Sequence, residues 1–104
     1  MFEFFRQPDI NQGVYEYLRD TGAVLLDVRT PNEYQEGHIP GSFNLPLQEL
    51  DYAEDVLENK QTPLYIYCRS GSRSRQAAYQ LQDMGFENVK NIGGILSYNG
   101  KIES

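Results

Sequence analysis

The sequence predicts an α/β fold in which helices flank a small central parallel sheet. Short apolar runs such as 23–26 and 63–67 are typical of strands that are buried on both faces. Along the chain these runs alternate with amphipathic segments of helical spacing, and such alternation favours a parallel sheet. With 104 residues, the chain is expected to form a single domain over residues 1–104.

The expected elements follow one another between residues 9 and 96. Helices are expected where apolar residues recur at helical spacing between polar caps and terminal glycines, and strands over the apolar runs. In the first half these are a helix from its cap Asp9 to a stop at Gly22 and a strand whose apolar run over 23–26 ends in Asp27-Val28-Arg29. They are followed by a helix capped by Thr30 that begins at Pro31 and reaches about Glu36, a turn over 37–41, and a strand over 42–45 closed by Pro46. In the second half they are an acidic helix over 47–59, a strand over 63–67, a helix that Gly85 ends, a strand over 86–92 and a short helix or turn from Gly93.

A single cysteine, Cys68, stands where the strand over 63–67 runs into a loop rich in arginine, glycine and serine. The loop residues are Arg69, Ser70, Gly71, Ser72, Arg73 and Ser74. Successive backbone N–H groups and the positive end of the following helix would stabilise a thiolate over a thiol. No Asp or Glu occurs from Gln61 to Gln82, although the chain has 15 acidic residues against 9 Lys and Arg. We therefore predict that Cys68 is a catalytic nucleophile in a local cationic pocket.

Composition argues against several classes of partner and cofactor. A net charge of −6 disfavours nucleic acids and acidic membrane surfaces, because binding to phosphates needs a larger basic surface. Residues 1–6 lack the basic start and the long apolar run of a signal peptide or spanning helix. A lone thiol fits a reducing compartment, so a cytoplasmic location is expected. One histidine and one cysteine do not make a zinc site, and no metal or organic cofactor is expected.

Segments spread over most of the chain resemble a single-domain rhodanese. They are Asp27-Val28-Arg29, Glu33-Tyr34, the stretch from Gly37 to Pro46, and the stretch from Cys68 to Ser74. The resemblance implies the rhodanese-like three-layer fold and the activity of a sulfurtransferase. In that activity Cys68 would take the outer sulfur of thiosulfate or a similar donor as a persulfide. It would then pass this sulfur to cyanide, a thiol or another thiophilic acceptor.

The residues around Cys68 are expected to assist this transfer. Arg69 and Arg73 are expected to steer and hold a small anionic donor, which suits the fixed donor geometry of guanidinium. Asp27 and Arg29 match family positions near the loop and are expected as supporting residues, with an ion pair that closes the strand end as the alternative. His38, the one histidine, matches a structural turn of the family, where its ring would bond to backbone instead of abstracting a proton.

Two other functions stay open. A cysteine phosphatase or arsenate reductase would use a similar loop, but a phosphatase-like loop has an arginine six positions after the cysteine, where this chain has Ser74. A persulfide carrier or interaction module would pass sulfur to a protein partner, and the acidic surface could dock a basic one. The family commonly has tryptophans after a Gly-Gly pair. Here Gly93 and Gly94 are followed by Ile95, Leu96, Ser97 and Tyr98, so the pocket wall is expected to differ.

Overall fold

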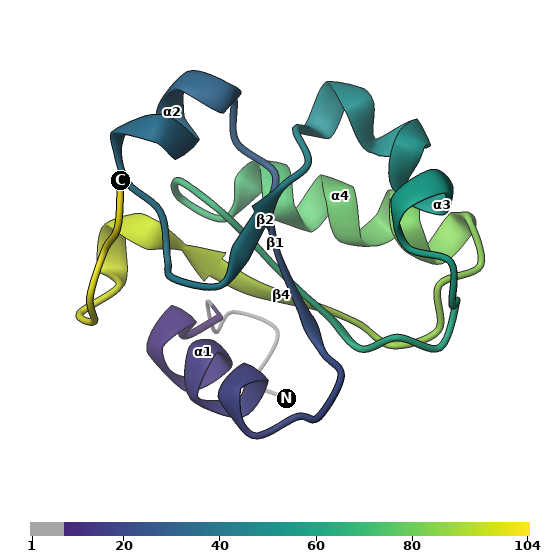
Figure 1. Ribbon diagram of the computed structural model, residues 1–104, viewed down its shortest axis with the longest axis horizontal. Coiled ribbons are helices and arrows are strands. Elements are labelled where there is room, and N and C mark those ends of the chain that lie inside the picture. Colours follow the sequence, from purple (N-terminus) through teal and green to yellow (C-terminus); the bar gives the residue numbers. More distant parts are fainter. Residues whose placement is uncertain (1–7) are drawn as a thin grey trace, which may run out of the picture.

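The computed structural model describes residues 8–104, which fold around a four-stranded parallel sheet (Figure 1). The strands are β1 (Val24–Asp27), β2 (Ser42–Asn44), β3 (Leu64–Cys68) and β4 (Val89–Gly94). Their order is β2-β1-β3-β4, and every neighbouring pair is parallel. The segment 1–6, where a signal peptide was not expected, lies outside the described residues. Within residues 8–104, no helix combines the length and the apolar character needed to cross a membrane.

Helices cover both faces of the sheet, which confirms the predicted α/β arrangement. They are α1 (Ile10–Leu18), α2 (Pro31–Glu36), the 3-10 helix η2 (Leu47–Tyr52), α3 (Ala53–Val56), α4 (Ser72–Asp83) and the 3-10 helix η3 (Ile95–Ser97). Figure 1 shows α1 on one face and α4, with α3 beside it, on the other. Helix α1 ends at Leu18, ahead of the predicted stop at Gly22, because residues 19–22 already turn toward β1.

Polar caps fix the starts of two helices where the sequence predicts them. The Asp9 carboxylate accepts the backbone N–H groups of Asn11 and Gln12 at the start of α1. Thr30 and Glu33 form a reciprocal capping box at the start of α2, in which each side chain accepts the backbone N–H of the other residue. Such caps satisfy N–H groups that have no partner inside a helix. The boundary between β1 and α2 is therefore set locally.

Alternate strand residues supply the two sides of the core. On the α1 side the strands contribute Leu25, Tyr65, Tyr67 and Ile92. On the α4 side they contribute Leu26, Leu64, Ile66 and Cys68. Because both faces of the sheet are covered, the central strand sequences are continuously apolar and do not alternate between apolar and polar residues. The last residue of β3 thereby turns its sulfur toward α4.

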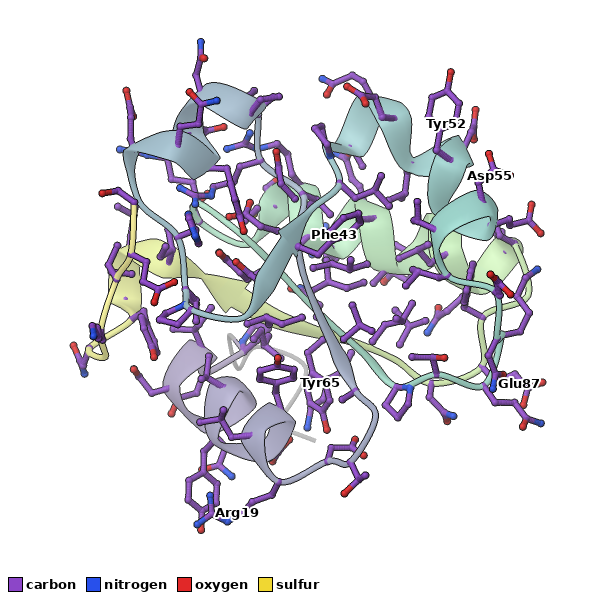
Figure 2. All side chains as sticks on the ribbon, in the orientation of Figure 1. Arg19, Phe43, Tyr52, Asp55, Tyr65 and Glu87 are labelled. Carbon is purple, nitrogen blue, oxygen red and sulfur yellow. The ribbon has the colours of Figure 1, made fainter. Side chains whose placement is uncertain are left out.

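The predicted acidic helix over 47–59 is only partly right. The segment is a 3-10 helix and then a single short α-helix, because Glu49 has a non-helical backbone (φ −110°, ψ 15°). The helix stops at Val56, since Leu57 extends (φ −121°, ψ 89°) and buries its side chain in the core. Its acidic side is solvated as expected, and Asp55 points away from the fold in Figure 2.

The predicted strand over 86–92 is displaced toward the C-terminus. Phe86 is buried against α4, so β4 begins only at Val89. The strand then continues through Gly93 and Gly94, so the short helix or turn expected from Gly93 begins only at Ile95, as η3. Gly94 pairs with Cys68, and the pairing shifts register between Ile66 and Tyr67. The end of β4 therefore lies directly beside the cysteine.

Candidate active site

The candidate site lies at the carboxyl ends of β1 and β3, the edge where parallel sheets bind their ligands. Cys68 is the last residue of β3, and α4 begins at Ser72 after a loop of three residues. Asp27 ends the neighbouring strand and pairs with Tyr67. The structure thus brings the predicted residues Asp27 and Cys68 to one rim of the sheet.

The cysteine loop folds back so that its polar groups meet the sulfur of Cys68. The Gly71 N–H donates to Sγ at 3.0 Å, and Sγ lies 3.4 Å from Oγ of Ser74. Gly71 has a φ of +106°, a conformation that favours glycine. Cys68 itself is only 1% exposed, although a polar loop follows it directly. It is buried because it still belongs to β3 and faces α4.

These contacts change the acidity of the thiol in opposite directions. Burial disfavours the charged form and by itself raises the pKa of Cys68. The hydroxyl of Ser74 and the backbone N–H groups of Ser74, Gly71 and Ser70 lower it. The hydrogen bonds outweigh the burial, and the pKa of Cys68 falls below its ordinary value. This local arrangement therefore favours the thiolate, which is the nucleophilic form.

Ser74 connects the cysteine to a residue that the sequence analysis missed. The buried Ser74 hydroxyl lies 2.7 Å from Oδ1 of Asn91 and 3.0 Å from the carbonyl oxygen of Gly71. Oδ1 of Asn91 also accepts the N–H of Gly93 at 3.0 Å. The one available signal was a polar residue inside a predicted strand. Asn91 thus holds both the serine and the end of β4 in place.

We expect Ser74→Ala to raise the pKa of Cys68, because it removes the side-chain hydrogen bond that most strongly stabilises the thiolate. The measurement is the rate of alkylation by iodoacetamide as a function of pH, whose midpoint should move to higher pH. Gln76→Ala, an exposed change on the same helix, is the control and should leave the midpoint in place. An unchanged midpoint for Ser74→Ala would contradict this role.

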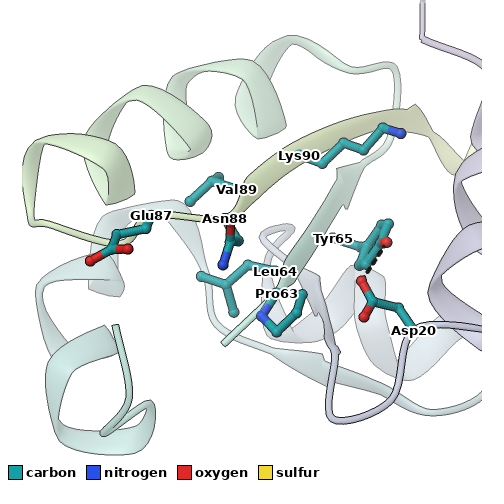
Figure 3. A pocket seen from close by; sticks show the side chains of 8 residues that line it. All are labelled: Asp20, Pro63, Leu64, Tyr65, Glu87, Asn88, Val89 and Lys90. Atoms are coloured by element: carbon teal, nitrogen blue, oxygen red, sulfur yellow. Dashed lines mark hydrogen bonds between the residues drawn. The ribbon is translucent and has the colours of Figure 1, made fainter. Parts of the chain in front are cut away.

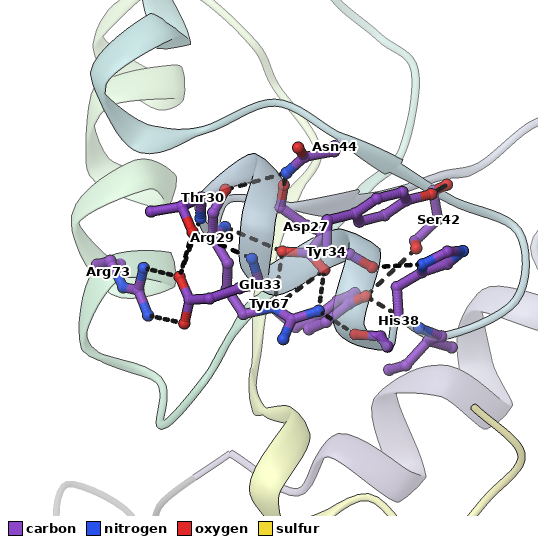
Figure 4. A network of polar contacts seen from close by, with 12 residues as sticks. Asp27, Arg29, Thr30, Glu33, Tyr34, His38, Ser42, Asn44, Tyr67 and Arg73 are labelled. Carbon is purple, nitrogen blue, oxygen red and sulfur yellow. Dashed lines mark hydrogen bonds and ion pairs between the residues drawn. The ribbon is translucent and has the colours of Figure 1, made fainter. Parts of the chain in front are cut away.

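Arg73 is held by an ion pair with Glu33 (Figure 4). Its Nη1 and Nη2 donate to the two carboxylate oxygens of Glu33 at 2.7 and 3.0 Å. The same carboxylate closes the capping box with Thr30. Arg73 was expected to hold an anionic donor, but both terminal nitrogens contact α2. Glu33 was anticipated only as a helix-start residue and family match, so this bridge from α2 to α4 was missed.

The Glu33–Arg73 pair makes a pH-dependent contribution to stability. The Arg73 guanidinium, helped by Thr30, lowers the pKa of Glu33 from 4.5 to about 2. Because the folded-state pKa is the lower one, the contribution is complete above about pH 4.5 and disappears as the pH falls toward 2. We expect Glu33→Gln to reduce the free energy of unfolding by about 1 kcal/mol at pH 7, and by almost nothing near pH 2.

Urea unfolding across this pH range measures the difference between Glu33→Gln and the unaltered protein. Glu36→Gln, which removes an exposed acid from the same helix, is the matched control. A cost of Glu33→Gln that is the same at every pH would show that the carboxylate charge does not stabilise the fold.

Asp27 and Arg29 form a buried ion pair beside the loop (Figure 4). Nη2 of Arg29 donates to Oδ2 of Asp27 at 2.6 Å and to the carbonyl oxygen of Gly37 at 2.7 Å. Nε of Arg29 also donates to Asp27, at 3.0 Å. No hydrogen bond from either side chain to the cysteine loop is found among residues 8–104. These contacts match the alternative interpretation, an ion pair that closes the strand end and positions the turn after α2.

His38 contacts the backbone, as expected for a structural turn. Its Nδ1 lies 2.8 Å from the carbonyl oxygen of Tyr34, and its ring stacks on the Tyr34 ring with the centroids 3.8 Å apart. Its backbone also pairs with that of Glu103. The ring is therefore engaged by α2 rather than by the sulfur.

Cavities occur at both ends of the sheet. One of about 550 Å³ lies at the amino ends of β3 and β4, where Tyr65 donates to Asp20 (Figure 3). No residue of the cysteine loop lines it. A smaller cavity, of about 180 Å³, includes Arg69 and Ser70 in its wall. Only the smaller of these two cavities adjoins the cysteine loop. Within residues 8–104, no group of three or more His, Cys, Asp or Glu residues is arranged to hold a metal ion.

A family model described as "Rhodanese-like domain" matches residues 11–101. The chain is 39% identical to the putative sulfur carrier protein YrkF of Bacillus subtilis over 92% of the chain and 53% of that protein. It is 37% identical to the thiosulfate sulfurtransferase PspE of Escherichia coli, over 67% of the chain and 68% of that protein.

A solved structure described as a rhodanese with anions from E. coli superposes with a TM-score of 0.73. It is 31% identical to this chain, and the likeness covers 79% of this chain and 98% of that one. The chain spans 65%, 53% and 25% of the lengths of three curated relatives that it matches.

Proposed function

Because the chain belongs to the rhodanese-like domain family, which includes sulfurtransferases, we propose that it transfers sulfane sulfur through a persulfide on Cys68. The donor is thiosulfate or a similar small anion, and the acceptor is cyanide or a thiol. The single free cysteine suits a reducing compartment such as the cytoplasm. The contact of Sγ with the Gly71 N–H and the Ser74 hydroxyl is the observation that carries the proposal.

The reaction proceeds in two displacements. The Cys68 thiolate attacks the outer sulfur of thiosulfate, a new S–S bond forms, and sulfite leaves with the electron pair of the broken bond. The acceptor then attacks the outer sulfur of the persulfide, the bond to Sγ breaks, and the Cys68 thiolate is restored. The product is thiocyanate when the acceptor is cyanide, and it is the acceptor's persulfide when the acceptor is a thiolate. Charge and atoms balance without any further oxidant or reductant.

The loop supplies what each displacement needs. Hydrogen bonds lower the pKa of Cys68 despite its burial, so more of the attacking thiolate is present. Backbone N–H groups of the loop are directed at the sulfur and can also stabilise a persulfide anion. Arg73, although paired with Glu33, is near enough to Cys68 for their charges to interact. Arg69 is exposed and is available to attract the anionic donor.

Intact-protein mass spectrometry tests this proposal. Brief treatment with thiosulfate should add the mass of one sulfur atom, and peptide mapping should locate it on Cys68. Subsequent cyanide should remove it. Absence of the adduct, or an adduct elsewhere, would contradict the proposed persulfide.

A persulfide carrier is the second candidate, favoured by the 39% identity to a protein named as a putative sulfur carrier. As a carrier, the loaded protein would react slowly with cyanide and rapidly with a thiol or an acceptor protein. A phosphatase is disfavoured, because Ser74 occupies the position of the phosphatase arginine and is buried against the sulfur. That alternative requires hydrolysis of p-nitrophenyl phosphate, which we expect to be negligible.

A further inference from the structure

The buried hydroxyl of Ser74 has a single proton but several possible acceptors. The nearest is Oδ1 of Asn91, which lies 2.7 Å from Oγ of Ser74. The carbonyl oxygens of Gly71 and Gly93 lie 3.0 and 3.5 Å from Oγ, and Sγ of Cys68 lies 3.4 Å from it. Because a hydroxyl donates one hydrogen bond, these atoms compete for the same proton.

A second contact fixes the orientation of the Asn91 amide. The same atom that meets Ser74 also accepts the backbone N–H of Gly93 at 3.0 Å. Because an N–H group only donates, this atom must be the amide oxygen and not the amide nitrogen. The oxygen has no proton, so its contact with Ser74 is made by the hydroxyl proton. At 2.7 Å this contact has the usual length of an O–H···O hydrogen bond, and it is the shortest that Ser74 makes.

The thiol of Cys68 is compatible with this arrangement, whereas the thiolate is not. As a thiol, Cys68 donates its S–H to Oγ of Ser74, which accepts that bond while it donates to Asn91. A thiolate has no proton and can only accept. Ser74 therefore stabilises the thiolate only when its hydroxyl rotates from Oδ1 of Asn91 to Sγ. The Gly71 N–H donates to Sγ without any such rearrangement.

Charged side chains around the sulfur do not change when the hydroxyl rotates. Asp27 at the end of β1 is bound to Arg29, and Arg73 of α4 is bound to Glu33 of α2. Arg73 is near enough to Cys68 for their charges to interact. The other charged residues of the loop, α4, β4 and η2 are exposed: Arg69, Arg75, Asp83, Lys90, Glu49 and Asp51. Rotation of the Ser74 hydroxyl therefore affects the acidity of Cys68 through hydrogen bonds alone.

We propose that Asn91 is a positioning residue that competes with Sγ of Cys68 for the hydroxyl proton of Ser74 and thereby limits how readily the thiolate forms. The hydroxyl donates to Asn91 while Sγ is uncharged, and to Sγ while Cys68 is a thiolate. The same rotation accompanies both displacements of the proposed function, because negative charge leaves Sγ in the first and returns to it in the second. That consequence rests on the proposed function, whereas the competition itself requires no sulfur transfer.

Titration of the thiolate by its ultraviolet absorbance tests the competition, and no reagent has to reach the buried sulfur. The chain has one cysteine, so the signal that remains after subtraction of a Cys68→Ser titration belongs to Cys68. Asn91→Leu removes the competing acceptor and keeps a side chain of similar size. We expect the midpoint to fall by about one pH unit, the effect of one hydrogen bond gained by the thiolate. An unchanged or higher midpoint would overturn the proposal, since Asn91 would then not oppose ionisation.

The shift caused by Asn91→Leu should depend on Ser74. Ser74→Ala removes the shared proton, so adding Asn91→Leu to that variant should leave its midpoint unchanged. Asn88→Leu is the matched control, because it removes the same amide from an exposed residue just before the other end of β4. This control should titrate like the unaltered protein. An equal shift with and without Ser74 would show that the shared proton is not the cause.

Asn91→Asp provides a second test if Asn91→Leu does not fold. An aspartate keeps an acceptor for both Ser74 and the Gly93 N–H, but it accepts more strongly and adds a negative charge. The midpoint should therefore rise. The rise should be larger with Ser74 present than in the Ser74→Ala variant, where only the added charge acts. Equal rises in the two backgrounds would refute the competition.

These titrations use the unloaded protein, so their outcome is independent of the proposed function. If the midpoints shift as expected but thiosulfate adds no sulfur to Cys68, the proposed function fails and the role of Asn91 stands. If Cys68 is loaded with sulfur but Asn91→Leu does not lower the midpoint, the role of Asn91 fails and the proposed function stands.

Discussion

Replacing Cys68 by serine should reduce sulfur transfer at least about a thousandfold, to the background rate. A serine hydroxyl at neutral pH is not ionised, and it forms no persulfide that could carry the sulfur. Single-turnover transfer from thiosulfate to cyanide measures the loss. Turnover that survives in Cys68→Ser would refute a mechanism in which this residue holds the sulfur.

The fold should tolerate this replacement. The Gly71 N–H and Ser74 Oγ contact the sulfur and remain available to a hydroxyl, so the buried oxygen keeps partners. We expect the free energy of unfolding to fall by about 1 kcal/mol. Circular dichroism and denaturant unfolding at neutral pH separate this small loss from the loss of activity. Gln76→Ala serves as the control variant and should transfer sulfur normally.

Replacing Asp27 by alanine should cost about 3–5 kcal/mol of the free energy of unfolding, the largest effect on stability that we expect. Asp27 is fully buried and Arg29 is 6% exposed. Removing the carboxylate leaves the guanidinium buried with the Gly37 carbonyl as a remaining acceptor. Urea unfolding at pH 7 measures the cost. Such a loss is a large part of the stability of a domain of this size.

The matched control for Asp27→Ala is an exposed ion pair in the same protein. Lys60 and Glu54 lie 2.7 Å apart, but their side chains are 35% and 54% exposed. Glu54→Ala should therefore cost about 0–1 kcal/mol. A double variant, Asp27→Leu with Arg29→Met, should recover part of the loss, because no buried charge is then left without a partner. Similar costs for Asp27→Ala and Glu54→Ala would contradict the importance of burial.

Local patterns were enough to predict the central strands of the sheet and the position of Cys68 at the end of one of them. The runs 23–26 and 63–67 are apolar because β1 and β3 are covered on both faces, so the sequence indicates that they are strands. The Thr30 cap of α2 is a local feature and was predicted, whereas the reciprocal bond from Glu33 that makes it a capping box was not. The pattern over 47–59 misled, since helical spacing there does not reveal that Leu57 packs in an extended conformation.

The parts of the site that were missed depend on contacts between distant residues. Asn91 follows Ser74 by 17 positions, and Arg73 follows Glu33 by 40. No periodicity or cap relates such pairs. The burial of Cys68 was missed for a similar reason: it depends on where α4 lies over the end of β3. Sequence patterns predicted the position of the loop. The hydrogen bonds and ion pairs around it could be identified only in the folded structure.

The Glu33 carboxylate also has a consequence for motion. It completes the cap of α2 and at the same time holds Arg73 at the start of α4. Fraying of the first turn of α2 therefore releases Arg73, and loss of the Arg73 contact weakens the cap. Local opening of α2 and loosening of the first turn of α4 are therefore expected to occur as one cooperative event. The amide hydrogens of these two segments would then exchange with solvent together.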